Sequence, residues 1–232
     1  MKIGIHQPNF FPWLGFFHKI FVSDVFVYLN HVENNPRSAI YTKRVKIIVN
    51  NQEHWLTCSL KNETDKVFIP INQMRIDNPE RLKDKQLKTL ELNYKKNPFF
   101  SEVFPIIEAF YNHKSDLIAE RNIFVANTIC DKLNITTRKI LSDSLDIHTS
   151  STQLLVDIIK KVNGNCYMPG GGADGYQQDE LFIQNTISLT PQNFKHPVYS
   201  QFNSQQFITG LSIIDALMNT GFEGTESLIK NV

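Results

Sequence analysis

The first thirty residues predict a strand, a helix and a second strand in direct succession. The stretch KIGIH (2–6) has the apolar character of a short buried strand. Pro8 prevents its continuation, because proline has no backbone N–H to donate to a neighbouring strand. Residues 13–22 suit a helix, and DVFVYLN (24–30) is a second apolar and aromatic strand. Since parallel strands need a long crossover connection, this opening indicates a parallel sheet.

Later segments interrupt this pattern and then resume it. Residues 45–49 and 54–60 alternate around Asn50-Asn51, which predicts a β-hairpin that forms a flap or a sheet edge. The residues from 79 to 133 have helical spacing, beginning at the cap Asn78 and the first-turn Pro79. Within this segment, Ser115-Asp116 is expected to cap a further helix that reaches Leu133. Further elements are expected at 67–71, 138–141, 151–162, 166–168, within 182–189, and from 211 to a stop at Gly221. We therefore predict an α/β fold: a Rossmann-like, mainly parallel sheet flanked by helices, with an inserted β-hairpin and a helical middle segment.

Length and charge limit the partners that the chain can have. At 232 residues, one domain spanning 1–232 is expected, with residues 79–133 as a helical subregion. The 24 basic and 23 acidic residues nearly cancel, so no overall field recruits nucleic acid or an anionic membrane. The chain shows neither a signal-peptide pattern nor an apolar run of the ~20 residues that span a bilayer. We expect a cytoplasmic protein without membrane insertion, in which a local cluster binds any anion.

His6 is the first candidate for chemistry. In open α/β sheets, ligands collect beyond the carboxyl ends of strands, and His6 leaves the first predicted strand at such an end. A neutral imidazole there suits a general base or a phosphate contact. An equally open alternative is that His6 holds its own loop through hydrogen bonds to backbone groups. The aromatic residues that follow favour a core, and Trp13 is the best exception.

Basic and glycine-rich segments are candidates for binding an anion. PRSAIYTKRVK (36–46) concentrates Arg37 and Arg44 after the second strand, where guanidinium groups could clamp a phosphate or a carboxylate. A solvated hairpin edge is the alternative. The loop GGGADGY (170–176) lacks the dinucleotide fingerprint and the P-loop lysine, but Asp174 and Tyr176 could donate or accept directed hydrogen bonds there. A tight turn explains these glycines equally well.

The C-terminal third contains further polar candidates. HPVYSQF (196–202) places His196 and Tyr199 in an extended polar loop, and Ser212 and Asp215 fall in the first turns of the last helix, where Asp215 could simply complement the helix dipole. No serine lies in a nucleophile-elbow pattern. The seven histidines are scattered without the spacing of metal ligands, so no metal is expected.

Several blocks of the sequence resemble, in order, the WbqC-like family. These blocks are HQPNFFPWLGFFHKI, SDVFVYLNHVE, RSAIYTKRVKI, NYKKNPFF, the Arg121-Asn122 pair, YMPGGGADGY, HPVYSQF and LSIIDALMNTG. The resemblance implies a place in bacterial gene clusters for O-antigen and other surface polysaccharides, and it implies a pathway more than a mechanism. The family pattern falls on His6, Gln7, Pro8, Trp13, Gly15, Arg37, Arg44, Asn122, Tyr176, Tyr199, Gln201, Ser212 and Asp215. The chain departs from it at Asn30, where an acidic residue is expected, and at Pro169-Gly170, where a Ser-Gly pair is commoner.

Together these features predict a transferase of O-antigen-type (lipopolysaccharide) biosynthesis that transfers an acyl or aminoacyl group to a nucleotide-linked amino sugar. His6 and Asp215 are the expected catalytic residues. The expected substrate-binding residues are Gln7, Trp13, Arg37, Arg44, Asn122, Asp174, Tyr176, His196, Tyr199, Gln201 and Ser212. The ligand is a nucleotide-linked sugar or another small phosphorylated molecule; pathway enzymes are possible partners, and no cofactor is indicated. Two alternatives stay open: nucleotidyl transfer, although the His-x-Gly-His signature is missing, and a non-catalytic module that binds a sugar nucleotide or a partner enzyme.

Overall fold

A parallel sheet of five strands forms the centre of the protein. A computed structural model describes residues 1–35, 39–61, 68–170, 178–202 and 204–232. Every neighbouring pair of strands in this sheet is parallel. In order across the sheet the strands are β7 (Arg138–Leu141), β2 (Val25–Tyr28), β1 (Lys2–His6), β8 (Cys166–Met168) and β9 (Ser188–Leu189). The predicted α/β fold with a mainly parallel sheet is confirmed.

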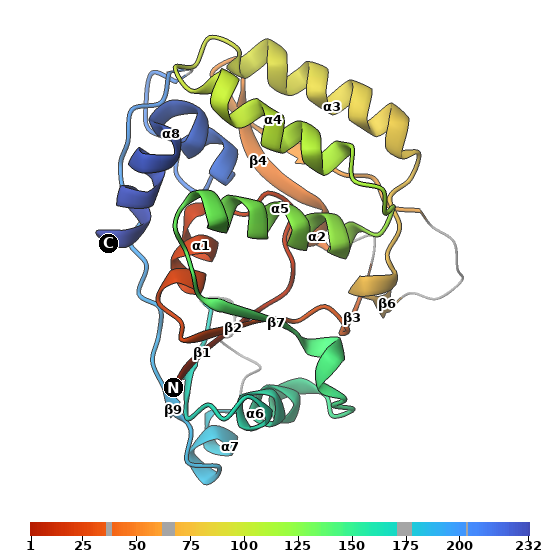
Figure 1. The fold of residues 1–232 in the computed structure, drawn as a ribbon, viewed down its shortest axis with the longest axis vertical. Coiled ribbons are helices and arrows are strands. Elements are labelled where there is room, and N and C mark those ends of the chain that lie inside the picture. The colour runs from red at the N-terminus through yellow and green to blue at the C-terminus, as the bar shows by residue number, and fades with distance from the viewer. Residues whose placement is uncertain (36–38, 62–67, 171–177, 203) are drawn as a thin grey trace.

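Helices cover both faces of this sheet. Figure 1 shows α1 (Leu14–Phe21) and α5 (Ile118–Lys132) on one face, and α6 (Ser151–Lys161) and α7 (Asp179–Gln184) on the other. The alternation of side chains along each strand explains the two layers. Ile3 and Ile5 of β1 pack in one hydrophobic cluster with α6. The other face of β1 therefore carries Gly4 and His6, and it is covered by α1.

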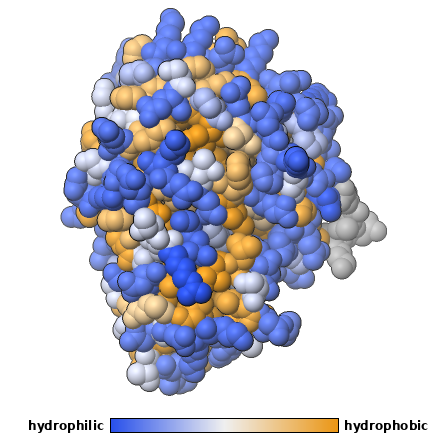
Figure 2. Space-filling view, viewed as in Figure 1, coloured by the Kyte–Doolittle hydropathy of each residue, from blue (hydrophilic) through white to orange (hydrophobic). Residues whose placement is uncertain are grey.

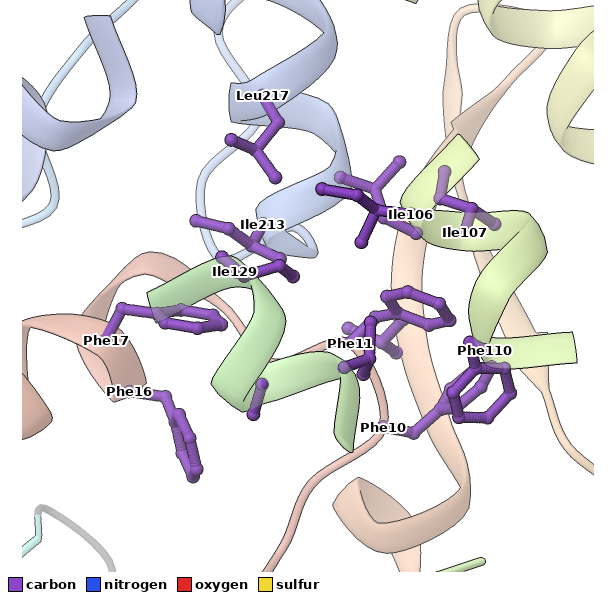
Figure 3. Close-up of a cluster of buried hydrophobic side chains, with 14 of the residues drawn as sticks. Phe10, Phe11, Phe16, Phe17, Ile106, Ile107, Phe110, Ile129, Ile213 and Leu217 are labelled. Carbon is purple, nitrogen blue, oxygen red and sulfur yellow. The ribbon is translucent and has the colours of Figure 1, made fainter. Parts of the chain in front are cut away.

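A second hydrophobic cluster joins the sheet to three further helices. These are α3 (Pro79–Tyr94), α4 (Phe100–Tyr111) and α8 (Ile213–Lys230), whereas α2 (Ile40–Lys43) contributes no residue to the cluster. In Figure 3, Phe16 and Phe17 of α1 lie near Ile129 of α5 and Ile213 of α8, while Phe11 lies beside α4. All five side chains are at most 2% exposed. The expectation that the early aromatic residues form core is confirmed.

Two small antiparallel sheets flank the large one. β4 (Arg44–Val49) pairs with β5 (Gln52–Thr57), and β3 (Glu33–Asn34) pairs with β6 (Ile69–Pro70). Asn50 and Asn51 both have positive φ, 51° and 63°, as a two-residue type I′ hairpin turn requires. The predicted hairpin is confirmed. Because Ser212 N donates to Lys46 O at 2.8 Å, the hairpin also contacts the start of α8.

The helical segment begins where the sequence predicts, but two of its boundaries differ. Asn78 Oδ1 accepts a hydrogen bond from Arg81 N at 3.2 Å and caps α3. The helix expected from Ser115 starts only at Ile118, because Ser115 Oγ accepts from Leu117 N and forms a turn instead of a cap. In the C-terminal helix, Gly221 leaves helical geometry as predicted. A further helical stretch then follows it to Lys230, which the sequence did not reveal.

The face seen in Figure 2 is mostly hydrophilic, with hydrophobic residues reaching the surface between charged ones. The edge strands of the large sheet are β7 and β9. On β7, Arg138 is exposed, and charge on an edge strand discourages pairing with another chain. Among the helices in the described ranges, none combines the length and the apolar character needed to cross a bilayer.

Candidate functional site

His6 lies at the carboxyl end of the central strand and is partly buried. Its ring meets the ring of Phe16 edge to face, with the centroids 5.1 Å apart. Its Nδ1 lies 2.9 Å from the carbonyl oxygen of Gln7. Because that oxygen can only accept, Nδ1 must carry the proton, and the lone pair is on Nε2. Both sequence interpretations of His6 are therefore compatible: Nδ1 holds the loop, and Nε2 is left for chemistry.

Lys19 of α1 approaches the same strand end from the face of the sheet that α1 covers. Its side chain is only 2% exposed, and Nζ donates to the carbonyl oxygen of Ile5 at 2.9 Å. The ammonium group also lies 5.9 Å from the centre of the Tyr167 ring. Sequence reasoning did not single out this lysine. The available signal was its spacing, three residues after Phe16 on the apolar face of the helix, where a charged residue is unusual.

Burial changes the protonation of both groups. It is the main cause that lowers the pKa of His6 to about 4, the positive charge of Lys19 lowers it further, and the hydrogen bond to Gln7 partly opposes these effects. Burial also lowers the pKa of Lys19 to about 8. At neutral pH this strand end therefore holds a neutral imidazole beside a mostly protonated ammonium group.

The neighbouring strands bring amide and hydroxyl groups to this edge. Leu29 N, directly after β2, donates to His6 O at 2.8 Å, so β1 and β2 end side by side. Beyond them, Asn30 Nδ2 donates to Asp143 Oδ2 at 2.7 Å, and Ser142 Oγ donates to Asn30 Oδ1 at 3.0 Å. Asn30 occupies the position where the family pattern predicts an acidic residue, and the carboxylate here comes from Asp143, after β7. Gln7 Oε1 accepts from Asn34 Nδ2 at 3.3 Å.

The glycine-rich loop starts at this edge as well. A Cβ placed on Gly170 would lie 3.8 Å from Lys19 Nζ, and among the described atoms it would meet nothing else within 4 Å. The beginning of this loop thus lies next to the ammonium group. Asp174 and Tyr176 of the loop, and Arg37 of the basic segment, lie outside the described residues.

A second group of candidates surrounds the start of α8. The rings of Trp13 and His196 stack with centroids 6.3 Å apart, and those of His196 and Tyr199 stack at 6.4 Å. His196 Nδ1 lies 2.9 Å from the carbonyl oxygen of Pro197, while its Nε2 is buried and has no hydrogen-bond partner among the described residues. Tyr199 then donates its hydroxyl to Asp215 Oδ2 at 2.8 Å. Trp13, His196, Tyr199 and Asp215 thus form a chain of neighbouring side chains, each in contact with the next.

Asp215 is completely buried and accepts three hydrogen bonds. Gln201 Nε2 donates to Oδ2 at 3.1 Å, and the hydroxyl of Tyr94 donates to Oδ1 at 3.2 Å, besides the bond from Tyr199. Burial raises the pKa of Asp215 to about 6, because the loss of hydration outweighs the three donors. Tyr94 had no signal in the sequence beyond its position on the apolar face of α3.

Two further candidates, Ser212 and Asn122, form hydrogen bonds with backbone groups. Ser212 caps α8: its Oγ accepts from Ile214 N at 3.2 Å and donates to Phe11 O at 2.8 Å. Asn122 is fully buried, and its Nδ2 donates to Pro8 O and Thr42 O.

Arg44 lies in the hairpin, with its guanidinium carbon 4.5 Å from the centre of the Trp55 ring. Its Nε is buried and has no hydrogen-bond partner among the described residues. No hydrogen bond, ion pair or ring contact between described residues joins Arg44, or Asp215, to His6.

These features define an α/β protein with polar groups gathered beyond the carboxyl ends of its parallel strands, which is where such folds bind small molecules. The chain belongs to the WbqC-like protein family, whose family model matches residues 7–227. Members of this family are often found in polysaccharide gene clusters. The chain is 25% identical over 232 residues to the uncharacterized protein Rv1507c of Mycobacterium tuberculosis, a match that covers 98% of this chain and 97% of that one. No solved structure matches.

Proposed function

We propose that this protein is a cytoplasmic enzyme of bacterial surface polysaccharide biosynthesis that transfers an acyl or aminoacyl group to the amino group of a nucleotide-linked amino sugar. The observation that carries the proposal is the neutral His6 at the end of the central strand, with Nδ1 bonded to Gln7 O and the lone pair on Nε2. Such an imidazole can accept a proton without first losing one.

In the proposed reaction, the sugar nitrogen attacks the carbonyl carbon of an activated acyl donor, such as a thioester. The nitrogen–carbon bond forms, the bond from carbon to the leaving sulfur breaks, and His6 Nε2 takes the proton that the amine loses. The imidazolium then gives this proton to the departing thiolate. Because burial and the charge of Lys19 lower the pKa of His6 to about 4, Nε2 is unprotonated throughout the neutral range. Because kcat/KM reports the free enzyme, kcat/KM limited by this group should therefore decline only near pH 4, whereas an ordinary histidine would make it decline near 6.5.

In this proposal, the remaining candidates contact the ligand or position the residues that do. Gln7 presents its amide beside His6, and the stack of Trp13, His196 and Tyr199 offers flat surface for a base or a sugar ring. Asp215 enters as a positioning residue, because its carboxylate is wholly buried and holds Tyr199 and Gln201.

The other predicted binding residues are either positioning residues or ligand contacts in this proposal. Asn122 positions the loop after β1 through Pro8. Arg37, Arg44, Asp174 and Tyr176 stay predicted ligand contacts.

The low pKa of His6 also favours a second candidate, a non-catalytic module that binds a nucleotide-linked sugar. An imidazole this weakly basic accepts a hydrogen bond well but takes a full proton less readily. Such a module would be stabilised by its ligand without consuming it.

The experiment that tests the proposal incubates the purified protein with a panel of nucleotide-linked amino sugars and acyl thioesters, and detects products by mass spectrometry. We expect an acylated sugar nucleotide, and a loss of turnover by a factor of about 10² to 10⁴ in His6→Ala. His148→Ala is the matched control, because His148 is exposed and lies on the surface beside Asp146. Full turnover in His6→Ala would refute the role of His6. Thermal stabilisation without any product would favour the binding module, and release of pyrophosphate would indicate nucleotidyl transfer.

A further inference from the structure

We propose that Lys19 is the anion-binding residue of this site, and that its ammonium group binds a phosphate of a nucleoside diphosphate ligand at the carboxyl end of β1. This inference rests on the proposed function only for the kind of ligand. The contacts of Lys19 support it independently.

The first support is a buried charge without a counterion. Lys19 is 2% exposed, and within the described ranges no carboxylate lies within salt-bridge distance of it. Its one hydrogen bond there, to Ile5 O, uses one of three ammonium protons. An ammonium group held in a protein interior without a counterion is unfavourable. A side chain of the same length without charge would suit this position better, unless an anion completes it.

The second support is the position of the two unused protons. Lys19 Nζ lies at the end of β1 beside His6, whose pKa its charge lowers, and 3.8 Å from where a Cβ on Gly170 would be. Among the described atoms, that position next to Gly170 has no other neighbour within 4 Å. A glycine at this point has no side chain that would lie between its own backbone and the ammonium group, so an oxyanion can approach Lys19 there.

The charge at this strand end selects the ligand chemistry. At the end of β1 itself, a neutral imidazole lies next to an ammonium group, which favours an anion there over a metal ion or an amine. The Asp143 carboxylate at the same edge follows β7, accepts from Asn30 and Asn72, and makes no ion pair with Lys19. A Schiff base would need the free amine as nucleophile, but the bond from Nζ to the Ile5 carbonyl favours the protonated form. Diphosphate is the anion that the proposed substrates carry.

Anion binding would also change the base. The positive charge of Lys19 is one cause of the low pKa of His6. A bound phosphate neutralises this charge, so the pKa of His6 should rise when the ligand binds. The ligand would then strengthen the proton acceptor at the moment when it is needed.

The test compares wild type, Lys19→Met and Lys139→Met, each as the full chain, by calorimetric titration with UDP and with inorganic pyrophosphate. Methionine keeps the length of the side chain and removes the charge. Lys139 is the matched control, because it also donates to backbone carbonyl oxygens, those of Ile135 and Thr137. We expect Lys19→Met to bind both probes about 30-fold more weakly or worse, and Lys139→Met to bind as wild type does.

Stability without ligand separates this role from a structural one. Replacing an uncompensated buried charge by an apolar group should leave the melting temperature of Lys19→Met unchanged or higher. A lower melting temperature with normal binding would overturn the proposal, and so would a wild-type protein that binds neither probe.

A measurement on the wild type keeps the proposal testable if Lys19→Met does not fold. NMR titration of His6 should show a higher pKa with pyrophosphate than without it, and an unchanged value would overturn the proposal. Weakened binding in Lys19→Met, together with no acylated product from any sugar, would support Lys19 and refute acyl transfer.

Discussion

Asp215 shows how far burial can outweigh hydrogen bonding at a single residue. Three donors, from Tyr94, Tyr199 and Gln201, surround its carboxylate. Each donor lowers the pKa, yet burial raises it to about 6 from an ordinary value of 3.8. The folded protein thus keeps a proton that the unfolded chain has already released between pH 3.8 and 6.

This difference predicts a pH dependence of stability. Because the folded state binds more protons in that window, the contribution of Asp215 to the free energy of unfolding falls as pH rises from 3.8 to 6, by about 3 kcal/mol in total. Asp215→Asn removes the titrating group with little change in shape. Urea unfolding of both proteins at pH 4 and pH 7 should show Asp215→Asn gaining up to about 3 kcal/mol relative to wild type at the higher pH. A pH-independent difference between the two proteins would contradict the shifted pKa.

The sequence located some candidate residues in the fold, but it did not show which of them lie together. His6 could be placed because one short strand and Pro8 locate it at a strand end. The contact of Trp13 with His196 could not be predicted, since the two are far apart in the chain and meet only through the fold. Lys19 was missed because a lysine in a helix is expected on the solvated face.

At the scale of elements, the kink in α8 is set by one glycine. Gly221 has φ 66° and ψ −174°, a conformation that L side chains rarely adopt. A Cβ at this position would lie 2.7 Å from the ring of Phe99, and Phe99 N donates to Met218 O at 3.3 Å. The two parts of α8 therefore pack around Phe99, and the glycine is required both for the backbone and for space.

Gly221→Ala should lower the free energy of unfolding by about 3 kcal/mol or more, through backbone strain and the contact with Phe99. Gly210 is the matched control. It also has a positive φ, 72°, but a Cβ there would meet nothing within 4 Å among the described atoms. Gly210→Ala should therefore lose only about 1 kcal/mol, measured for both variants by urea unfolding. Equal losses would show that the contact with Phe99 is unimportant.

Elements with strong local signals were predicted well. The hairpin turn at Asn50-Asn51 and the cap of α3 at Asn78 depend on a few neighbouring residues. The predicted start of α5 was wrong because Ser115 Oγ accepts a hydrogen bond from Leu117 N in a turn. Helix propensity alone does not distinguish this turn from a helix cap. The helical stretch after Gly221 was missed because a glycine is the usual stop signal.

At the scale of the whole molecule, the strand order decides where a ligand can lie. β1 is central, so His6 lies between the ends of β2 and β8. This order could not be deduced from the sequence, because the strands share one apolar pattern. The helices α3, α4 and α5 share a hydrophobic cluster with α1 and β2. One domain over residues 1–232 stays a prediction.

The most direct test of the ligand site is a crystal structure of the protein with a UDP-linked amino sugar. We predict a phosphate oxygen within about 3 Å of Lys19 Nζ, as in other charge-assisted hydrogen bonds, and the sugar amine within hydrogen-bond reach of His6 Nε2. A sugar nucleotide bound elsewhere, with Lys19 still bonded to Ile5 O alone, would contradict the site at the end of β1.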